Sequence, residues 1–515
     1  MSRNITEVRL LNVPLESDYA HTLYFASKSK QTDYFKSKTK FSGNDFSYQR
    51  KDKIIRYDKD YDDLLGCNYV MYRNTDSTNK WYYAFITKME YVNDGVTNIH
   101  IETDVIQTWL FDYKLKQSFV EREHVSDDSI GKHTLPEGLE LGEYIINDST
   151  KDTNLEPSNL IVIGSTIVPS DLVKMIGGTF HGIYSGVRYY AYPKDQLGSL
   201  IQSVTDEFDD GAISSIFLAP EFLIAENTGG GVIDTSNSPA MYPFSVNKKY
   251  GLEGYSPRNN KLKTYPYCYL LVSNGNGACA EYRYEYFASS TCDFAVYGAL
   301  TPGCSIRLLP TIYKGVQLPE TEGLNLGKFP QCNWATDQYT NWLTQNGVNI
   351  ATSVMTAGAS AVTGAMMGSV VPGVGTVAGG VLGALGGVAG IANSLNEVHK
   401  AQMIPPQTQG NINCGDVVTA KGDNTFTYYN MSIRSEYAQI IDKYFDMFGY
   451  KVNLVKTPNK NHRSNYWYTK CIDVNIDGAI PNEDMQKIKS CYNTGITFWK
   501  NPANIQDYSV SNSII

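Results

Sequence analysis

The sequence predicts a predominantly β protein of several domains, with an α+β part at its C-terminal end. Three observations lead to this prediction. The chain of 515 residues is longer than one ordinary hydrophobic core organises. Its 38 tyrosines favour half-buried sheet surfaces, where a ring packs on one side while the hydroxyl reaches water. Its 43 glycines and 20 prolines indicate a folded chain with many turns.

The first 148 residues are expected to form a β-rich domain. Polar and apolar residues alternate over 81–91 and 97–105, as in antiparallel strands with one buried face. Asp94 and Gly95 lie between these runs, and this pair is typical of a tight type I′ turn, in which both central residues have positive φ. We therefore predict a hairpin here. A second β-rich domain, inserted at 149–335, is indicated by short apolar runs between glycine-rich turns.

The segment at 336–404 is the most unusual part of the sequence, because residues 338–396 contain no Asp, Glu, Lys or Arg. Two weakly apolar spans, 348–371 and 374–392, are joined by Pro372 and Gly373. Each is long enough to cross roughly 30 Å as a helix. The glycines expected to form smooth helix-packing stripes are Gly364, Gly368, Gly375, Gly379, Gly383 and Gly387.

Three interpretations of this segment are open: a buried hairpin in an oligomer core, a flexible linker, and a sequestered membrane-active loop. The third is favoured over the linker because linkers are rich in polar residues. The apolar residues expected to meet the membrane are Val348, Ile350, Val354, Met355, Val362, Met366, Met367, Val370, Val371, Val377, Val381, Leu382, Leu385, Val388 and Ile391.

Residues 405–515 are expected to form an α+β domain. In 436–448 the residues Tyr437, Ile440, Ile441, Tyr444, Phe445 and Phe448 recur at steps of three and four, which predicts a helix with one apolar face. Gly449 is expected to end this helix in a left-handed conformation. A second helix is predicted after Pro481, with Asn482 as its N-cap and Met485, Ile488 and Tyr492 facing inward. Strands are predicted at 451–455 and 466–476.

No motif for catalysis, metal binding or cofactor binding is found in the sequence, so we expect no enzyme activity, no metal and no cofactor. The seven histidines form no HExxH motif, and neither a GxSxG elbow nor a GxxxxGK[ST] loop is present. The nine cysteines contain no CxxC pair, and the start of the sequence has no secretory signal, so synthesis in a reducing cytoplasm is expected. The net charge of −9 argues against DNA binding through neutralised phosphates.

Three further clusters each have a structural interpretation and a functional one. Asp206, Glu207, Asp209 and Asp210 could ligate calcium, but a solvated acidic surface is favoured. Glu121, Arg122, Glu123 and His124 are interpreted as interfacial ion-pair residues and not as a proton-transfer set. Tyr466, Trp467 and Tyr468 could stack on sugars, but strand alternation accounts for them.

Specific strings in the sequence resemble the tail-knob (distal tail-tube) proteins of small short-tailed phages of Gram-positive bacteria. The strings DVIQTWLFD (104–112) and SFVEREHV (118–125) carry the resemblance within 79–125. SEYAQIIDKYFDMFGYKVN (435–453), GITFWKN (495–501) and DYSV (507–510) extend it near the end, and YPYC (265–268) matches in the middle. The uncharged segment lies where that family carries a long hydrophobic loop.

The resemblance implies a structural protein of the virion, located at the distal end of the tail. It implies a homo-hexameric tube, bound to other tail proteins, through which double-stranded DNA passes without sequence specificity. It further implies that the hydrophobic loops plug the lumen and then penetrate the host membrane during genome ejection. Two alternatives remain: a tail-associated enzyme that degrades the cell wall, and a free-standing pore-forming protein.

Overall fold

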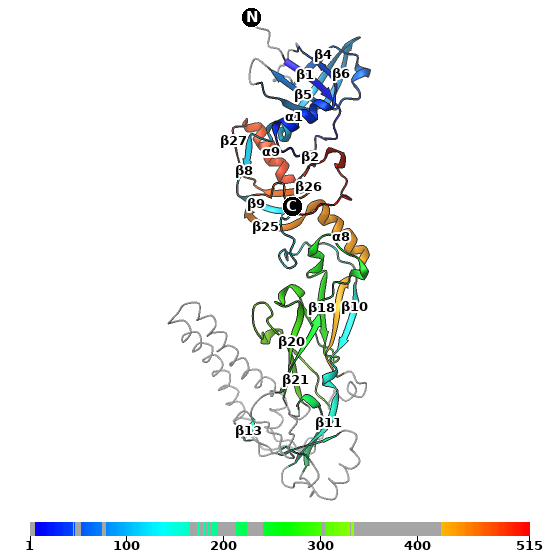
Figure 1. Cartoon of the computed structure of the whole chain (residues 1–515), viewed down its shortest axis with the longest axis vertical. Helices are drawn as coiled ribbons and strands as arrows, with labels where there is room; N and C mark the ends of the chain where they lie inside the picture. Colours follow the sequence, from blue (N-terminus) through cyan, green and yellow to red (C-terminus); the bar gives the residue numbers. More distant parts are fainter. Residues whose placement is uncertain are drawn as a thin grey trace, which may run out of the picture. The chain divides into compact units, whose positions relative to one another are not determined.

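The computed structural model describes residues 6–44, 46, 53–74, 79–164, 173–175, 179–180, 183–184, 188–193, 213–223, 240–299, 304–329, 331–333 and 424–515. The chain divides into two compact units (Figure 1). The first unit comprises Met1–Leu141, Ser256–Leu262 and Glu436–Ile515, and the second comprises Gly142–Tyr255 and Lys263–Ser435. The first unit therefore joins the two ends of the sequence.

The first unit contains a six-stranded sheet built from N-terminal residues. Its spatial order is β3-β1-β5-β6-β7-β4, and all neighbouring pairs are antiparallel. The strands are β1 (Thr6–Leu11), β3 (Thr39–Gly43), β4 (Ile54–Tyr57), β5 (Tyr69–Asn74), β6 (Tyr82–Asn93) and β7 (Val96–Thr103).

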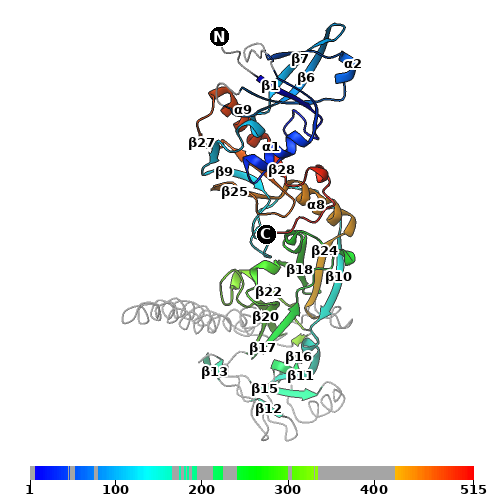
Figure 2. The same ribbon diagram turned by 45° about the horizontal axis from the view of Figure 1, so that its top comes forward.

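The second sheet of this unit combines strands from both ends of the chain. Its order is β2-β28-β26-β9-β25, with β2 parallel to β28 and the other pairs antiparallel. The strands are β2 (His21–Leu23), β9 (Ser118–Glu123), β25 (Tyr450–Lys456), β26 (Tyr466–Ile472) and β28 (Ile496–Trp499). Figure 2 shows the cyan β9 beside the orange β25, although more than 300 residues separate them. A small sheet pairs β8 (Tyr113–Leu115) with β27 (Ile476–Gly478).

The α-helices among the described residues cover or connect these sheets. They are α1 (Lys28–Ser37), α2 (Tyr61–Leu64), α3 (Val105–Trp109), α8 (Ser435–Phe448) and α9 (Asn482–Thr494). One core cluster contains Ile106 and Val120 from the N-terminal part together with Trp467, Ile488 and Phe498 from the C-terminal part. Burial of these shared apolar side chains holds the two ends of the sequence together.

The second unit is built from antiparallel sheets. Its strands are β10 (Tyr144–Lys151), β11 (Pro157–Gly164), β12 (Val173–Met175), β13 (Thr179–Phe180), β14 (Ile183–Tyr184), β15 (Arg188–Pro193), β16 (Ile213–Pro220), β17 (Ala240–Asn247), β18 (Cys268–Ser273), β19 (Cys279–Tyr282), β20 (Thr291–Ala299), β21 (Ser305–Pro310), β22 (Leu324–Asn325), β23 (Gln331–Asn333) and β24 (Thr427–Ile433). Their orders are β10-β24-β18-β19, β12-β15-β11-β16-β23, β17-β20-β21-β22 and β13-β14. The prediction of a mostly β protein with few helices is thus confirmed.

The predicted hairpin is confirmed, but its turn differs from the prediction. Asn93 pairs with Val96, so Asp94 and Gly95 form a two-residue connection between β6 and β7. Gly95 has φ 84°, whereas Asp94 is not among the residues with positive φ. The pairing register also shifts between Tyr91 and Asn93. The prediction of a type I′ turn is therefore wrong, because only one of its two central residues is left-handed.

Both predicted C-terminal helices exist, with two corrections. Gly449 ends α8 with φ 63°, as expected, but Ile440 on the same helix is 64% exposed. The buried positions of α8 are Ala438, Ile441, Asp442 and Phe445. In α9, Asn482 is the first helical residue and Pro481 occupies the cap position, so Asn482 is not the N-cap. Proline suits the start of a helix because its missing N–H would have no partner there.

The predicted strand at 466–476 is confirmed only in part. It ends at Ile472, Asp473 takes φ 54°, and the short β27 begins at Ile476. The strand predicted at 451–455 is present as β25.

Candidate functional site

All of the predicted membrane-facing residues and helix-packing glycines, within 348–391, lie outside the described residues. The acidic cluster at 206–210 lies outside them too. Of the part of the chain that the structure describes, no helix is long and apolar enough to cross a membrane. No group of three or more His, Cys, Asp or Glu in that part could hold a metal ion.

The strands on either side of the uncharged segment both belong to the second unit. Before it, β23 pairs with β16 at the edge of a five-stranded sheet. After it, β24 lies between β10 and β18, in the interior of another sheet. The segment at 334–423 is therefore inserted between two strands of the fold and is not a terminal extension.

The main chain of the buried Asp152 fixes the chain where it returns from this segment. Asp152 is fully buried and accepts a hydrogen bond of 2.5 Å from the Tyr242 hydroxyl. The Thr425 hydroxyl donates to the Asp152 carbonyl oxygen at 2.5 Å, and the Asp152 amide donates to the carbonyl of Phe426 at 3.1 Å. Burial raises the pKa of Asp152, and the bond from Tyr242 opposes this rise. Residues 424–426 are thus held before β24 begins.

Aromatic and amide side chains continue this anchoring along β24. The Tyr428 ring stacks on Phe244 with centroids 4.8 Å apart and an interplanar angle of 22°. The buried Asn430 accepts a bond of 2.6 Å from the Tyr284 hydroxyl. Asn147 on β10 donates to the Ser432 hydroxyl at 2.8 Å. Residues 424–426 therefore lead directly into β24, a buried strand that pairs with β10 on one side and β18 on the other.

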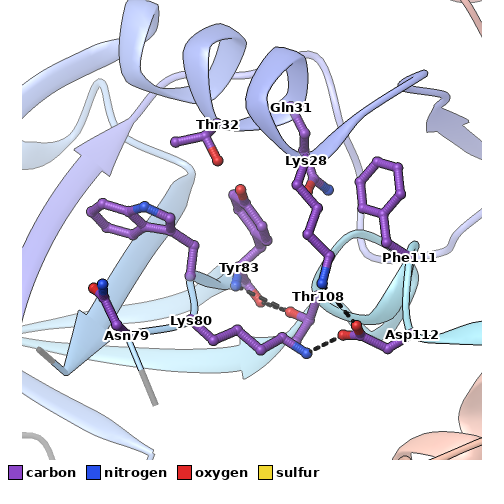
Figure 3. Close-up of a pocket in the computed structure, with 10 residues that line it drawn as sticks. Lys28, Gln31, Thr32, Asn79, Lys80, Tyr83, Thr108, Phe111 and Asp112 are labelled. Atoms are coloured by element: carbon purple, nitrogen blue, oxygen red, sulfur yellow. Dashed lines mark hydrogen bonds and ion pairs between the residues drawn. The ribbon is translucent and has the colours of Figure 1, made fainter. Parts of the chain in front are cut away.

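The first unit contains a polar pocket of about 370 Å³ between α1, the start of β6 and the residues after α3 (Figure 3). Lys28 and Lys80 point to opposite oxygens of Asp112, at 3.0 Å and 2.6 Å. The Lys80 ammonium also lies 3.3 Å from the centroid of the Trp109 ring. Burial raises the pKa of Asp112, but the bonds from the two lysines outweigh burial and lower that pKa overall. We interpret the pocket as an ion-pair junction of three segments.

The residues at 121–124 form contacts within the first unit. Arg122 pairs with Glu137 and donates to the Gly449 carbonyl at 2.7 Å, and Glu123 pairs with Lys456. The Nδ1 atom of His124 accepts the Tyr468 amide at 2.6 Å.

Arg122, Glu123 and His124 are buried by their own chain, so the interfacial interpretation is wrong for these three. Burial lowers the pKa of His124 to about 3, so the ring stays neutral at physiological pH. Glu121 differs from the three, because it pairs with Lys470 at a partly exposed position.

The aromatic run Tyr466, Trp467 and Tyr468 is also buried, with exposed fractions of 0%, 3% and 8%. The run therefore presents no exposed stack of rings to a sugar. Alternation is not the explanation either, because the second sheet is covered on both faces at β26.

Asp104 was missed by sequence reasoning. It is 1% exposed, caps α3 by accepting the Gln107 amide at 3.0 Å, and accepts the Tyr69 hydroxyl at 2.8 Å. Burial raises its pKa to about 6. Aspartate directly before an apolar run is an ordinary N-cap signal, and this signal could have found it.

The family comparisons agree with this architecture. The family described as Bacillus phage phi29, tail knob protein gp9, C-terminal domain, matches residues 235–513, which is more than half of the chain. The family described as caudoviral major tail protein N-terminus matches residues 4–114.

Individual relatives match over nearly the whole length. The tail knob protein gp9 of Bacillus phage B103 is 27% identical over a 600-residue alignment that covers 99% of this chain and 98% of the relative. That of Bacillus phage phi29 is 26% identical, with the same coverage. The solved structure of the bacteriophage C1 tail knob protein gp12 shares the fold with a TM-score of 0.66 at 15% identity, covering 99% of this chain and 100% of that one. The chain belongs to the tail knob protein gp9 family of phages and is a structural protein of the phage tail.

Proposed function

We propose that six copies of this chain form a tube at the distal end of the tail, through which the phage genome leaves. In this proposal 1–148 and 405–515 form the tube wall and 149–335 forms the knob. The segment at 336–404 plugs the lumen before infection and penetrates the host membrane during ejection. Its partners are other tail proteins, the host membrane and the passing double-stranded DNA. The subunits assemble in the host cytoplasm.

The uncharged stretch at 338–396 is the observation that carries this proposal. Charged side chains make up 19% of the whole sequence, so their absence over this length needs a cause. An apolar segment of this size requires either protein surface to cover it or a bilayer to enter. Neighbouring subunits can provide the first environment, and the host membrane the second.

The insertion point supports a loop that moves while its base stays fixed. The segment lies between β23 and β24, and Asp152, Tyr242 and Thr425 hold the chain at its return. A rigid base allows the loop to leave the lumen without unfolding the second unit. Inside a bilayer the loop would be helical, because only helices satisfy all backbone hydrogen bonds there without a partner strand.

The net charge of −9 is compatible with a conduit for DNA, because a surface of like charge does not retain the phosphate backbone. The proposal therefore needs no basic groove along the lumen.

Deletion of residues 348–391 tests the membrane role. Purified particles or rings that carry the deletion are added to dye-loaded liposomes, and dye release is measured. We expect release to fall to the level of buffer alone. The matched control is Ile440→Ser, which removes one exposed apolar side chain outside the segment and should leave release unchanged. Undiminished leakage after the deletion would remove the loop from the mechanism.

Class averages of the same samples by electron microscopy test the six-fold ring separately.

A further inference from the structure

The first unit contains a second cavity, of about 260 Å³, which the proposed tail function does not use. It lies between the residues after β2, the residues after α3 and the strands β26 and β28. Its apolar walls come mainly from Tyr24, Phe25, Leu110, Phe111, Trp467 and Phe498.

The rings of the walls also contact one another. Trp467 and Phe498 stack with centroids 5.4 Å apart and an interplanar angle of 11°. Tyr24 meets Trp467 edge-on at 4.9 Å. Such walls favour a flat or aliphatic body, which gains by leaving water and by contact with the rings.

Two buried hydrogen-bond donors also line the cavity. Thr469 is 1% exposed, and its hydroxyl has no hydrogen-bond partner among the described residues. The hydroxyls of Tyr113 and Tyr492 lie 3.1 Å apart, and their bond uses one of the two hydrogens. The other tyrosine hydrogen remains available to an acceptor. Because the Thr469 hydroxyl and one tyrosine hydrogen are unused and line the cavity, they can donate to an acceptor that the cavity receives.

A lysine at the same cavity lacks an acidic partner. The Lys460 ammonium lies 5.5 Å from the centroid of the Tyr113 ring, and burial lowers its pKa. Within the described residues it forms no ion pair, whereas Lys456 pairs with Glu123 and Lys80 with Asp112. Asn459 fixes the preceding position, since its amide and its side chain donate to Glu123 at 3.0 Å and 2.9 Å. Lys460 is an exposed residue, so its ammonium is open to solvent as well as to an acid in the cavity.

We propose that this cavity binds a carboxylate attached to an apolar body. The carboxylate accepts hydrogen bonds from Lys460, Thr469 and the tyrosine pair, and the apolar body lies against Trp467 and Phe498. Two sources share this chemistry: the chain end of a partner protein with an apolar last residue, and a free aromatic or aliphatic acid. The proposal is independent of the membrane role of 336–404.

Calorimetric titration of the full-length protein tests the site with three probes. N-acetyl-phenylalanine imitates a chain end, its primary amide has the same body without the charge, and 3-phenylpropionate is a free acid. We expect both acids to bind at least about tenfold more tightly than the amide, because an ion pair and charge-assisted hydrogen bonds are lost with the charge. Tighter binding of N-acetyl-phenylalanine supports a chain end, and equal binding of the two acids supports a free acid.

Variants separate binding from folding. Lys460→Gln and Thr469→Val should each weaken acid binding about tenfold, and Thr469→Ser should retain it because it keeps the hydroxyl. The matched control is Lys470→Gln. Lys470 follows Thr469 on β26 and pairs with Glu121, so its replacement should leave affinity for the acid unchanged. Thermal unfolding of each variant reports whether it is folded. Equal binding of acid and amide, absence of binding by both acids, or full affinity in folded Lys460→Gln would each overturn the proposal.

Discussion

Both units bury aromatic rings, but buried charged side chains are concentrated in the first unit. Buried charged groups of the first unit include Arg122, Glu123, Lys261, Asp442 and Arg463, whereas Asp152 is the only one in the described part of the second unit. In the second unit Phe294 contacts the rings of Tyr282, Phe287 and Tyr428 at centroid distances of 5.1 to 5.5 Å.

This difference follows how each unit is joined. The first unit pairs β9 with β25 and β26, which are more than 300 residues away in the sequence. A register shift there would leave Glu123 buried without Lys456, and an unpaired buried charge is costly. We infer that the buried pairs select one register for distant segments. Ring packing in the second unit is less directional, because aromatic pairs tolerate several geometries.

The largest effect is expected from removing one member of a buried pair in the first unit. Glu123→Ala should lower the free energy of unfolding by about 3 kcal/mol, because Lys456 and Asn459 lose their acceptor. Hydrogen exchange measured by mass spectrometry should accelerate in β9, β25 and β26 but not in β20 and β24. Glu121→Ala, at a partly exposed pair, is the control and should cost less than about 1 kcal/mol. Equal effects of the two changes would contradict the comparison.

A smaller effect is expected from a ring in the second unit. Phe294→Leu keeps an apolar side chain but loses the ring contacts, so stability should fall by about 2 kcal/mol. Chemical denaturation measures the change, and exchange should accelerate in β20 and β24. Phe119→Leu, at a 37% exposed position of the first unit, should change stability by less than about 0.5 kcal/mol. A loss of stability above about 4 kcal/mol for Phe294→Leu would contradict the comparison, because it would show that the rings of the second unit also require one specific packing geometry.

The neutral state of His124 makes the first unit sensitive to acid. Its folded pKa is lowered to about 3, while the unfolded ring titrates near 6.5. Between these values the unfolded state binds more protons, so this group lowers the free energy of unfolding as pH falls, by up to about 1.4 kcal/mol per pH unit. Ring resonances of His124, assigned by comparison with His124→Gln, should not shift between pH 7 and 4.5. A titration within that range would show that the ring is not isolated from protons.

The smallest effect is expected from Asp104→Asn. An asparagine oxygen can still accept the Gln107 amide, so stability at neutral pH should change by about 1 kcal/mol or less. Burial raises the folded pKa of Asp104 to about 6, so its contribution to stability falls as pH rises from 3.8 to 6. The variant should lose this dependence in denaturation curves at several pH values. An unchanged pH profile would indicate that Asp104 is already ionised in the folded protein.

Local patterns determined several features of this protein correctly. The alternation on both sides of Asp94 and Gly95 predicts the hairpin of β6 and β7, and the apolar steps before Gly449 predict α8 and its left-handed end. These features depend on residues a few positions apart, which is the range over which periodicity and backbone preferences act. The lack of charge over 338–396 is likewise a property of the sequence alone.

Only the tertiary structure decided which of these side chains are buried and by what. Ile440 has the spacing of a core residue but is exposed, whereas Tyr466, Trp467 and Tyr468 are consecutive and all buried. Glu123 and His124 are residue types that usually lie at the surface. They are buried here because β25 and β26, more than 300 residues away in the sequence, pack beside them. The physical reason is that burial depends on segments distant in sequence, and no local pattern specifies which segment will cover a given face.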